Sequence, residues 1–266
     1  MTDTVLLDID QGIATLTLNR PAALNALSVE MMQDLHEATA RLAAATDVDV
    51  VVISGAGEHF MAGGDLKDFA RNLHLSPEER LEVFRAMIER YINPTVLLLQ
   101  GLPQPVVARV RGACAGFGLS LMMGCDLVVC ADDAVFTTAY SSIALSGDGG
   151  ASYFLPRQVG RRKAAELLLL AERFDAQEAL RLGLVSRVVP ATELDAETAR
   201  LAARLRAGPR HTYAEIKRLL ADSHDAALEA QLRAEGGAFA RCAANADFAE
   251  GVTAFLEKRK PSFGAG

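Results

Sequence analysis

The stretch "RGACAGFGLSLMMGCDLVVCADDAVF", residues 111–136, decides the fold, because it joins a glycine-rich turn to a short helix and a buried strand. Just before it, "PVVARVRG" (105–112) predicts a strand that runs into a glycine. Residues 117–125 have the pattern of a short helix, and "DLVVCAD" (126–132) predicts the next strand. An earlier segment, "SGAGEHFMAGGDLKDF" (54–69), also leads from a strand into glycine. Strands that alternate with helices indicate an α/β fold with partly parallel pairing.

The flanking N-terminal sequence carries local signals for a hairpin and two helices. Residues 4–21 alternate between apolar and polar side chains and turn at Asp10-Gln11-Gly12, which predicts a β-hairpin. Ser28 is a candidate N-cap for a helix with apolar residues at helical spacing. Ser76, followed by proline and two acids, predicts a second helix start.

From about Ala191 onward the sequence becomes helical throughout, with no predicted strand. We therefore expect two parts: residues 1–190 as an α/β core, and residues 191–266 as a helical C-terminal region. The apolar faces of those helices would pack on the core or on another subunit.

Composition limits the function classes. The 266 residues are half hydrophobic and carry a net charge of −7, and the basic residues form no long block, so a nucleic-acid partner is not expected. Four cysteines without C-x-x-C spacing favour reduced thiols over a zinc site. The acidic N-terminus is unlike a signal peptide, and no apolar run is long enough to span a bilayer. We expect a cytoplasmic protein without a membrane partner, although a mitochondrial location stays open.

The two glycine-rich turns match no standard nucleotide-binding motif. Neither fits G-x-G-x-x-G or the G-K-[ST] of a P-loop, and no G-x-S-x-G elbow occurs. Backbone N–H groups at such turns are free donors, and two aimed at one point form an oxyanion hole. The alternative is that these glycines only allow close packing of strand on helix.

A lone carboxylate, Asp148, lies in "GDGG" (147–150) between largely apolar stretches. It is either part of a surface turn or an acid whose pKa is raised by an apolar site. The five histidines have no carboxylate cluster beside them, and we expect no metal.

In combination, these motifs resemble the crotonase superfamily, also called the enoyl-CoA hydratase/isomerase family. The resemblance rests on "FMAGGDL" (60–66), the stretch 111–136 and "DGGASYFLPRQVG" (148–160), and it extends to "TLNRPAALNAL" (17–27) and "GVTAFLEKRKPSF" (251–263). It implies an α/β fold, a crotonase-like ββα spiral with a helical C-terminal trimerisation region. It also implies an acyl-CoA thioester as substrate, and homotrimers or hexamers built as dimers of trimers. No separate cofactor is implied, since coenzyme A enters as part of the thioester.

The resemblance places the oxyanion hole at the backbone amides of Gly64 and Phe117, with Gly116 beside them. Phe117 stands where the family often has glycine, so its side chain must find room and would narrow the acyl tunnel. The segment 69–88 is expected to line that tunnel.

The resemblance also implies contacts with coenzyme A. Contacts with substrate or coenzyme A are implied at Ala22, Ala23, Leu24, Ala62, Asp65, Leu66, Lys67, Gly116, Lys260 and Phe263. Many members of the family have a Lys or Arg near Ala22 as a phosphate contact, whereas residues 22–24 of this chain carry no basic side chain. Lys67 is either a phosphate ligand or an ordinary solvated lysine. Lys260 and Phe263 match a segment that can reach a neighbouring subunit's coenzyme A.

The expected reaction follows from which acids are present. Family hydratases use two glutamates, whose positions here are Ser120 and Tyr140. Without a second acid, hydration is disfavoured. Asp148 matches the single acid of family isomerases, which shift a double bond from a 3-enoyl to a 2-enoyl thioester through an enolate.

Three alternatives stay open at the sequence level. One is a hydratase in the broad family sense. Another is a dehalogenase or hydrolase of the 4-chlorobenzoyl-CoA type, because "AYSSIALSGD" (139–148) keeps its spacing, although the expected histidine near residues 91–93 is missing. The third is an acyl-CoA binder without turnover. Tyr140 is either a partner of Asp148 or an aromatic packing residue.

Overall fold

The computed structural model describes residues 3–264 and contains two β-sheets. The larger has six strands in the order β1-β2-β3-β4-β6-β9, and the smaller has three in the order β5-β7-β8. The strands of the larger sheet are β1 (Val5–Asp10), β2 (Ile13–Leu18), β3 (Val50–Gly55), β4 (Val106–Val110), β6 (Leu127–Ala131) and β9 (Arg187–Val189). Those of the smaller sheet are β5 (Ala113–Ala115), β7 (Val135–Thr137) and β8 (Phe174–Asp175).

The strand pairing confirms the α/β expectation. The β1–β2 hairpin is antiparallel, with Asp10 opposite Ile13, whereas β2, β3, β4, β6 and β9 pair in parallel. Parallel neighbours need crossover connections, and helices supply most of them. The carboxyl ends of β3 and β4 both lead into the glycine-rich turns, so the sheet brings these two turns to one edge.

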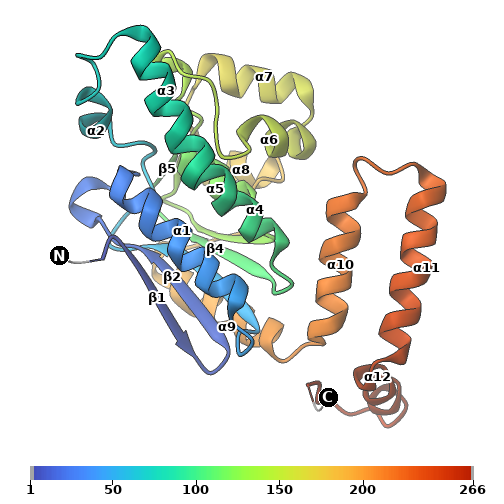
Figure 1. Cartoon of the computed structure of the whole chain (residues 1–266). Helices are drawn as coiled ribbons and strands as arrows, with labels where there is room; N and C mark the ends of the chain where they lie inside the picture. The colour runs from blue at the N-terminus through green and yellow to red at the C-terminus, as the bar shows by residue number, and fades with distance from the viewer. Residues whose placement is uncertain (1–2, 265–266) are drawn as a thin grey trace.

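The helices fall into a set around the sheets and a set beyond them (Figure 1). The first set is α1 (Val29–Ala44), α2 (Leu66–Ala70), α3 (Pro77–Met87), α4 (Asn93–Gly101), α5 (Phe117–Met123), α6 (Ala151–Val159), α7 (Arg161–Leu170), α8 (Ala176–Arg181) and α9 (Leu194–Arg206). The second set is α10 (Arg210–Asp222), α11 (Leu228–Ala244) and α12 (Ala246–Leu256). Both predicted N-caps are confirmed: Ser28 caps α1 and Ser76 opens α3 with a capping box.

At β3 the larger sheet is covered on both faces, which explains why this strand is buried along its whole length. Val51 and Ile53 point into the main core, together with the apolar face of α1. The alternate residues Val50 and Val52 pack against Leu201 on α9. Helix α9 thus covers the second face of the sheet, although it follows the expected division at residues 190/191. That division itself remains a prediction.

The helical segment that Ser76 caps changes register in its middle. Between α3 and α4, residues Ile88–Ile92 form one π-helical turn, in which the amide of Asn93 bonds the carbonyl of Ile88. Pro94 explains the change, because proline lacks the N–H that would bond the carbonyl four residues back and its ring clashes with that carbonyl. The hydroxyl of Thr95 bonds the carbonyl of Tyr91 at 2.6 Å.

The predicted helical C-terminal region is also confirmed. Figure 1 shows α10 and α11 as a pair standing beside the core, with α12 at their base. Ion pairs tie α10 to the core: Lys217 lies 2.5 Å from Asp126, and Arg210 lies 2.6 Å from Asp49. Within residues 3–264, no helix is both long and apolar enough to cross a membrane.

Candidate functional site

The first glycine-rich turn presents a free backbone donor at Gly64. The carbonyl of Gly63 accepts from the amide of Leu27 at 2.8 Å, and the amide of Asp65 donates back to Leu27 at 3.0 Å. In a trans peptide the C=O and N–H point in opposite directions, so the N–H of Gly64 points away from Leu27. Among residues 3–264, no acceptor is recorded for that N–H. The segment around Leu27 therefore fixes the direction of this donor.

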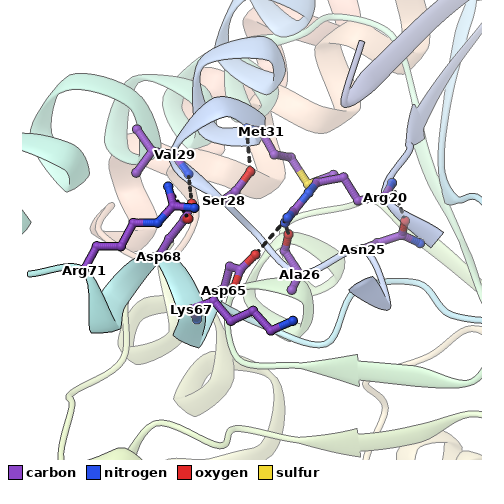
Figure 2. A network of polar contacts seen from close by, with 10 residues as sticks. All are labelled: Arg20, Asn25, Ala26, Ser28, Val29, Met31, Asp65, Lys67, Asp68 and Arg71. Carbon is purple, nitrogen blue, oxygen red and sulfur yellow. Dashed lines mark hydrogen bonds and ion pairs between the residues drawn. The ribbon is translucent and has the colours of Figure 1, made fainter. Parts of the chain in front are cut away.

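A polar network holds the turn in place (Figure 2). Arg20 pairs with Asp65 at 2.8 Å and also donates to the carbonyl of Ala26. The other carboxylate oxygen of Asp65 caps α2 through the amide of Lys67, at 3.0 Å. Burial raises the pKa of Asp65, but the Arg20 hydrogen bond and these amides outweigh it and hold the pKa below its usual value. Asp65 is therefore ionised and committed to Arg20 and α2.

Asn25 ties the same segment to the end of β3. It is fully buried, with φ of +55°. Its side chain accepts from the amide of Arg20 at 2.8 Å and donates to the carbonyls of Ala56 and His59. His59 in turn accepts from the amide of Ala113 at 3.0 Å. Asn25 and His59 therefore link the loop before α1 to both glycine-rich turns.

The second donor is the amide of Phe117, the first residue of α5. The carbonyl of Gly116 accepts the first bond of the helix, from the amide of Ser120 at 3.1 Å. The N–H of Phe117 belongs to the same peptide, so it points out of the helix N-terminus. No acceptor for it is recorded within residues 3–264. Gly116 has φ of +51°, a conformation that glycine adopts at little cost.

The two turns meet at the wall of one cavity. A methyl group on Gly116 would lie 3.3 Å from the Cα of Gly63, so the two backbones are in close contact. The cavity has a volume of about 680 Å³, and its lining includes both Gly64 and Phe117. Two free N–H groups at adjoining turns of one cavity form the arrangement of an oxyanion hole.

Asp148 lines the same cavity from a turn formed by Gly147, Gly149 and Gly150. Its Oδ1 lies 2.7 Å from the hydroxyl of Tyr140, and its main-chain oxygen accepts from the hydroxyl of Ser120 at 2.9 Å. Ser120 and Tyr140 are buried and lie 3.0 Å apart, oxygen to oxygen. The carboxylate therefore has one oxygen bonded to Tyr140.

The surroundings of Asp148 shift its protonation. Burial raises its pKa above the usual value, and the hydrogen bond from Tyr140 opposes part of that increase. Burial and the nearby carboxylate raise the pKa of Tyr140 far above its ordinary value, so Tyr140 remains a neutral donor. A raised pKa makes the ionised carboxylate a stronger base, which suits it to taking and returning a proton.

The buried ring of Phe117 packs against the turn that carries Asp148. Its side chain is 2% exposed, and a methyl group on Gly149 would come within 2.6 Å of the ring. Gly149 also has φ of +57°. The ring of Phe117 thus supports the turn that carries Asp148, and only glycine leaves space for it.

A further part of the cavity wall comes from the segment 69–88 and the π-helical turn. Phe69 and Phe84 stack edge to face at 5.1 Å between ring centroids, and both line the cavity with Met87 and Ile88. This confirms the expectation that the segment lines the tunnel. The exposed side chains of Glu89 and Asn93 also line it. No histidine is found among the lining residues of the part of the chain that the structure describes.

The structure brings together most of the predicted catalytic and nearby residues and separates the others. Those lining the cavity are Gly64, Phe117, Tyr140, Asp148, Ala62, Leu66 and Gly116. Ala22, Ala23 and Leu24 form an adjacent turn, where the carbonyl of Leu24 accepts from the amide of Ala62 at 3.0 Å. Lys67 is exposed on α2. Lys260 and Phe263 lie in the C-terminal region, where Phe263 lines a second cavity of about 660 Å³ between α10, α11 and α12.

Sequence reasoning missed several residues that shape the site. Ser120 was noted as a missing glutamate, not as a partner of Asp148. Arg20 and Asn25 both lie in the quoted stretch 17–27, but their contacts cross from one segment to another. In residues 3–264, no cluster of three potential metal ligands is present, and the four cysteines are free thiols.

Comparison with known proteins decides the family. The family model described as enoyl-CoA hydratase/isomerase matches residues 8–266. The chain belongs to this family. A probable enoyl-CoA hydratase of Rhodobacter capsulatus is 37% identical over 98% of this chain and 97% of its own. A 1,2-epoxyphenylacetyl-CoA isomerase of Escherichia coli is 35% identical over 99% of both chains.

Solved structures agree with this assignment. A putative enoyl-CoA hydratase/isomerase from Mycobacterium abscessus superposes with a TM-score of 0.93 at 33% identity, over 98% of this chain and 100% of the other. The fold is therefore the crotonase fold expected from the sequence, with its helical C-terminal region. The protein is an acyl-CoA-processing enzyme of the enoyl-CoA hydratase/isomerase family.

Proposed function

We propose that this enzyme is an enoyl-CoA isomerase, which converts a 3-enoyl thioester into the 2-enoyl isomer. Asp148 takes a proton from C2 of the substrate and returns it at C4. The thioester oxygen becomes an enolate oxygen during this step and accepts hydrogen bonds from the amides of Gly64 and Phe117. Each such donor is worth about 3–4 kcal/mol to the developing charge.

One observation carries the proposal: Asp148 is a half-buried carboxylate with a raised pKa, in the same cavity as the two free amides. A double-bond shift needs one group that removes a proton and gives it back. The name of the Escherichia coli relative, an isomerase, is consistent with this reaction.

A hydratase is the first alternative, since many relatives carry that name. Addition of water needs a base for the water and an acid for the α-carbon. Ser120 and Tyr140 occupy the two glutamate positions, and their hydroxyls are bonded to Asp148. Glu89 is the other carboxylate on the cavity wall, but it is exposed on the π-helical turn.

A dehalogenase would use Asp148 as a nucleophile and needs a further group to activate water. On its wall the cavity has Glu89 and Asn93. His36 contacts Thr95 and Tyr91 but does not line the cavity. A binder without turnover remains an outcome of the experiment below.

The experiment incubates the protein separately with a 3-enoyl-CoA and a trans-2-enoyl-CoA, followed by chromatography with mass detection. An isomerase gives a conjugated product of unchanged mass from the 3-enoyl substrate. A gain of one water would show hydration instead. Binding of both thioesters without conversion would support the non-catalytic reading.

Variants then test the role of Asp148. Asp148→Asn should lower kcat by about 10²–10⁴-fold, the usual worth of a general acid or base, with little change in thioester binding. Asp8→Asn, an equal change of charge on exposed β1, is the control and should keep full activity. A comparable loss in Glu89→Gln would overturn the single-acid mechanism in favour of two acids.

Other properties implied by the family stay proposals. We infer a homotrimer or hexamer, because α11 and α12 expose large apolar side chains, including Phe239 at 75% and Phe255 at 83%. The coenzyme A moiety would follow the turn 22–24 and α2, where Lys67 is exposed. Lys260 and Phe263 would act across a subunit boundary. A cytoplasmic location fits an acyl-CoA substrate.

A further inference from the structure

Three polar side chains from three separate segments meet around Asp148. Ser120 comes from α5, Tyr140 precedes the short 3-10 turn Ser141–Ile143, and Asp148 lies in the glycine turn before α6. The hydroxyl of Tyr140 lies 2.7 Å from Asp148 Oδ1 and 3.0 Å from Ser120 Oγ. Ser120 Oγ also lies 2.9 Å from the main-chain oxygen of Asp148. Packing of the Tyr140 ring alone would not require these three polar contacts.

The number of hydrogens decides the direction of these bonds. The main-chain oxygen of Asp148 can only accept, so Ser120 donates its one hydrogen there. An ionised carboxylate also only accepts, so Tyr140 donates to Oδ1, in a bond of the short, charge-assisted kind. Ser120 therefore holds the main chain of Asp148, and its Oγ lies 3.0 Å from the tyrosine oxygen without donating to it. Each hydroxyl thus has one defined acceptor when Asp148 is the base.

We propose that Tyr140 is the positioning residue of Asp148: its hydroxyl occupies Oδ1 and leaves Oδ2 as the oxygen that takes and returns the substrate proton, while Ser120 holds the main chain of Asp148. This inference rests on the isomerase function proposed above. The proposal gives a role to the hydroxyls of Ser120 and Tyr140, which stand where family hydratases have glutamates. Both hydroxyls bond to Asp148, the acid at a third position in this cavity.

The arrangement also adjusts the acidity of the base. Burial alone would keep Asp148 protonated at higher pH, and the Tyr140 donor counters this by stabilising the carboxylate. The other ionisable side chains on the cavity walls are Arg85 from α3 and Glu89 from the π-helical turn, both exposed. Tyr140 is therefore the buried group best placed to set the pKa of Asp148.

The test is the pH profile of isomerase kcat in Tyr140→Phe. Loss of the donor raises the pKa of Asp148, so the rising limb of the profile moves to higher pH. At pH values below the limb, kcat falls about tenfold or more, the worth of a hydrogen bond to a charged group, and it recovers at high pH. A uniform loss of kcat with an unchanged midpoint would overturn the proposal, because it is what a purely structural role predicts.

A second variant, Tyr140→3-fluorotyrosine, keeps the test decisive if Tyr140→Phe does not fold. 3-Fluorotyrosine at position 140 keeps the ring and supplies a more acidic hydroxyl, which is a stronger donor. The limb should then move to lower pH, and an absent or opposite shift contradicts the proposal. Ser120→Ala should shift the limb in the same direction as Tyr140→Phe.

An infrared titration separates this proposal from the isomerase function. The carboxyl band of Asp148, assigned by its disappearance in Asp148→Asn, reports protonation without any turnover. A higher midpoint in Tyr140→Phe than in the wild type supports the pairing even if 3-enoyl-CoA is not converted. Equal midpoints refute it even if isomerisation is observed.

Discussion

Replacement of Gly149 by alanine tests how the acid-bearing turn is held. Gly149 has φ of +57°, a conformation that costs an L-residue about 1–2 kcal/mol. The added methyl group would also lie 2.6 Å from the Phe117 ring, which is too close for any real contact. Overpacking of this kind costs about 1–3 kcal/mol, so Gly149→Ala should reduce the free energy of unfolding by about 2–5 kcal/mol.

A double-mutant cycle with Phe117→Ala divides this cost into its two parts. Without the ring, Gly149→Ala should cost mainly the conformational part, about 1–2 kcal/mol, together with a smaller contribution from the contact with Ser120 Cβ at 3.2 Å. Gly183→Ala is the matched control, because Gly183 has φ of +77° but no atom within 4 Å of the added methyl group. It should cost the same conformational part in either background.

The assay is chemical denaturation at one fixed protein concentration, together with kcat on a 3-enoyl-CoA. Because the turn carries Asp148, a shift near 1 Å should lower kcat of Gly149→Ala by about 100-fold. The reasoning is refuted if Gly149→Ala costs no more than Gly183→Ala, or if its cost is the same with and without the Phe117 ring.

Three further predictions concern the acid, the turn network and assembly. Folding raises the pKa of Asp148, so the native state loses stability relative to the unfolded chain as the pH rises above the ordinary value of 3.8. Asp148→Asn should therefore gain stability relative to the wild type as the pH rises above about 4, and a difference that does not change with pH would contradict the raised pKa. Arg20→Met leaves Asp65 without its partner and should cost about 1–3 kcal/mol of stability and lower kcat, whereas unchanged values would show that the network does not fix Gly64. Light scattering should give three or six times the chain mass of 28.4 kDa, and a mass of one chain would refute the assembly.

Local signals were enough to predict most elements. The hairpin, the caps at Ser28 and Ser76 and the helical region after Ala191 depend on residues close in sequence, and all three are found. The position of α9 on the second face of the sheet was not predicted, since an amphipathic pattern shows that a helix has an apolar face but not which surface it meets.

The site was predicted unevenly for a similar physical reason. Its residues were located by resemblance, and the structure places Gly64, Phe117, Tyr140 and Asp148 around one cavity. The contacts that give them their properties join distant segments. Neither the bond from Ser120 to the backbone of Asp148 nor the position of the Phe117 ring behind Gly149 has a signature in sequence spacing.

The π-helical turn confines a change in chain length to one place on the cavity wall. Such a turn holds one residue more than a regular helix needs for the same rotation, and Pro94 keeps it open. Loss of one residue from 88–92 together with Pro94→Ala would therefore restore a regular helix without rotating α3 against α4, and Phe84 and Met87 would stay on the cavity wall. The change would fall on the turn itself, which presents Ile88 and Glu89 to the cavity. A one-residue deletion or insertion here would thus alter the wall of the pocket locally, without disturbing its catalytic groups.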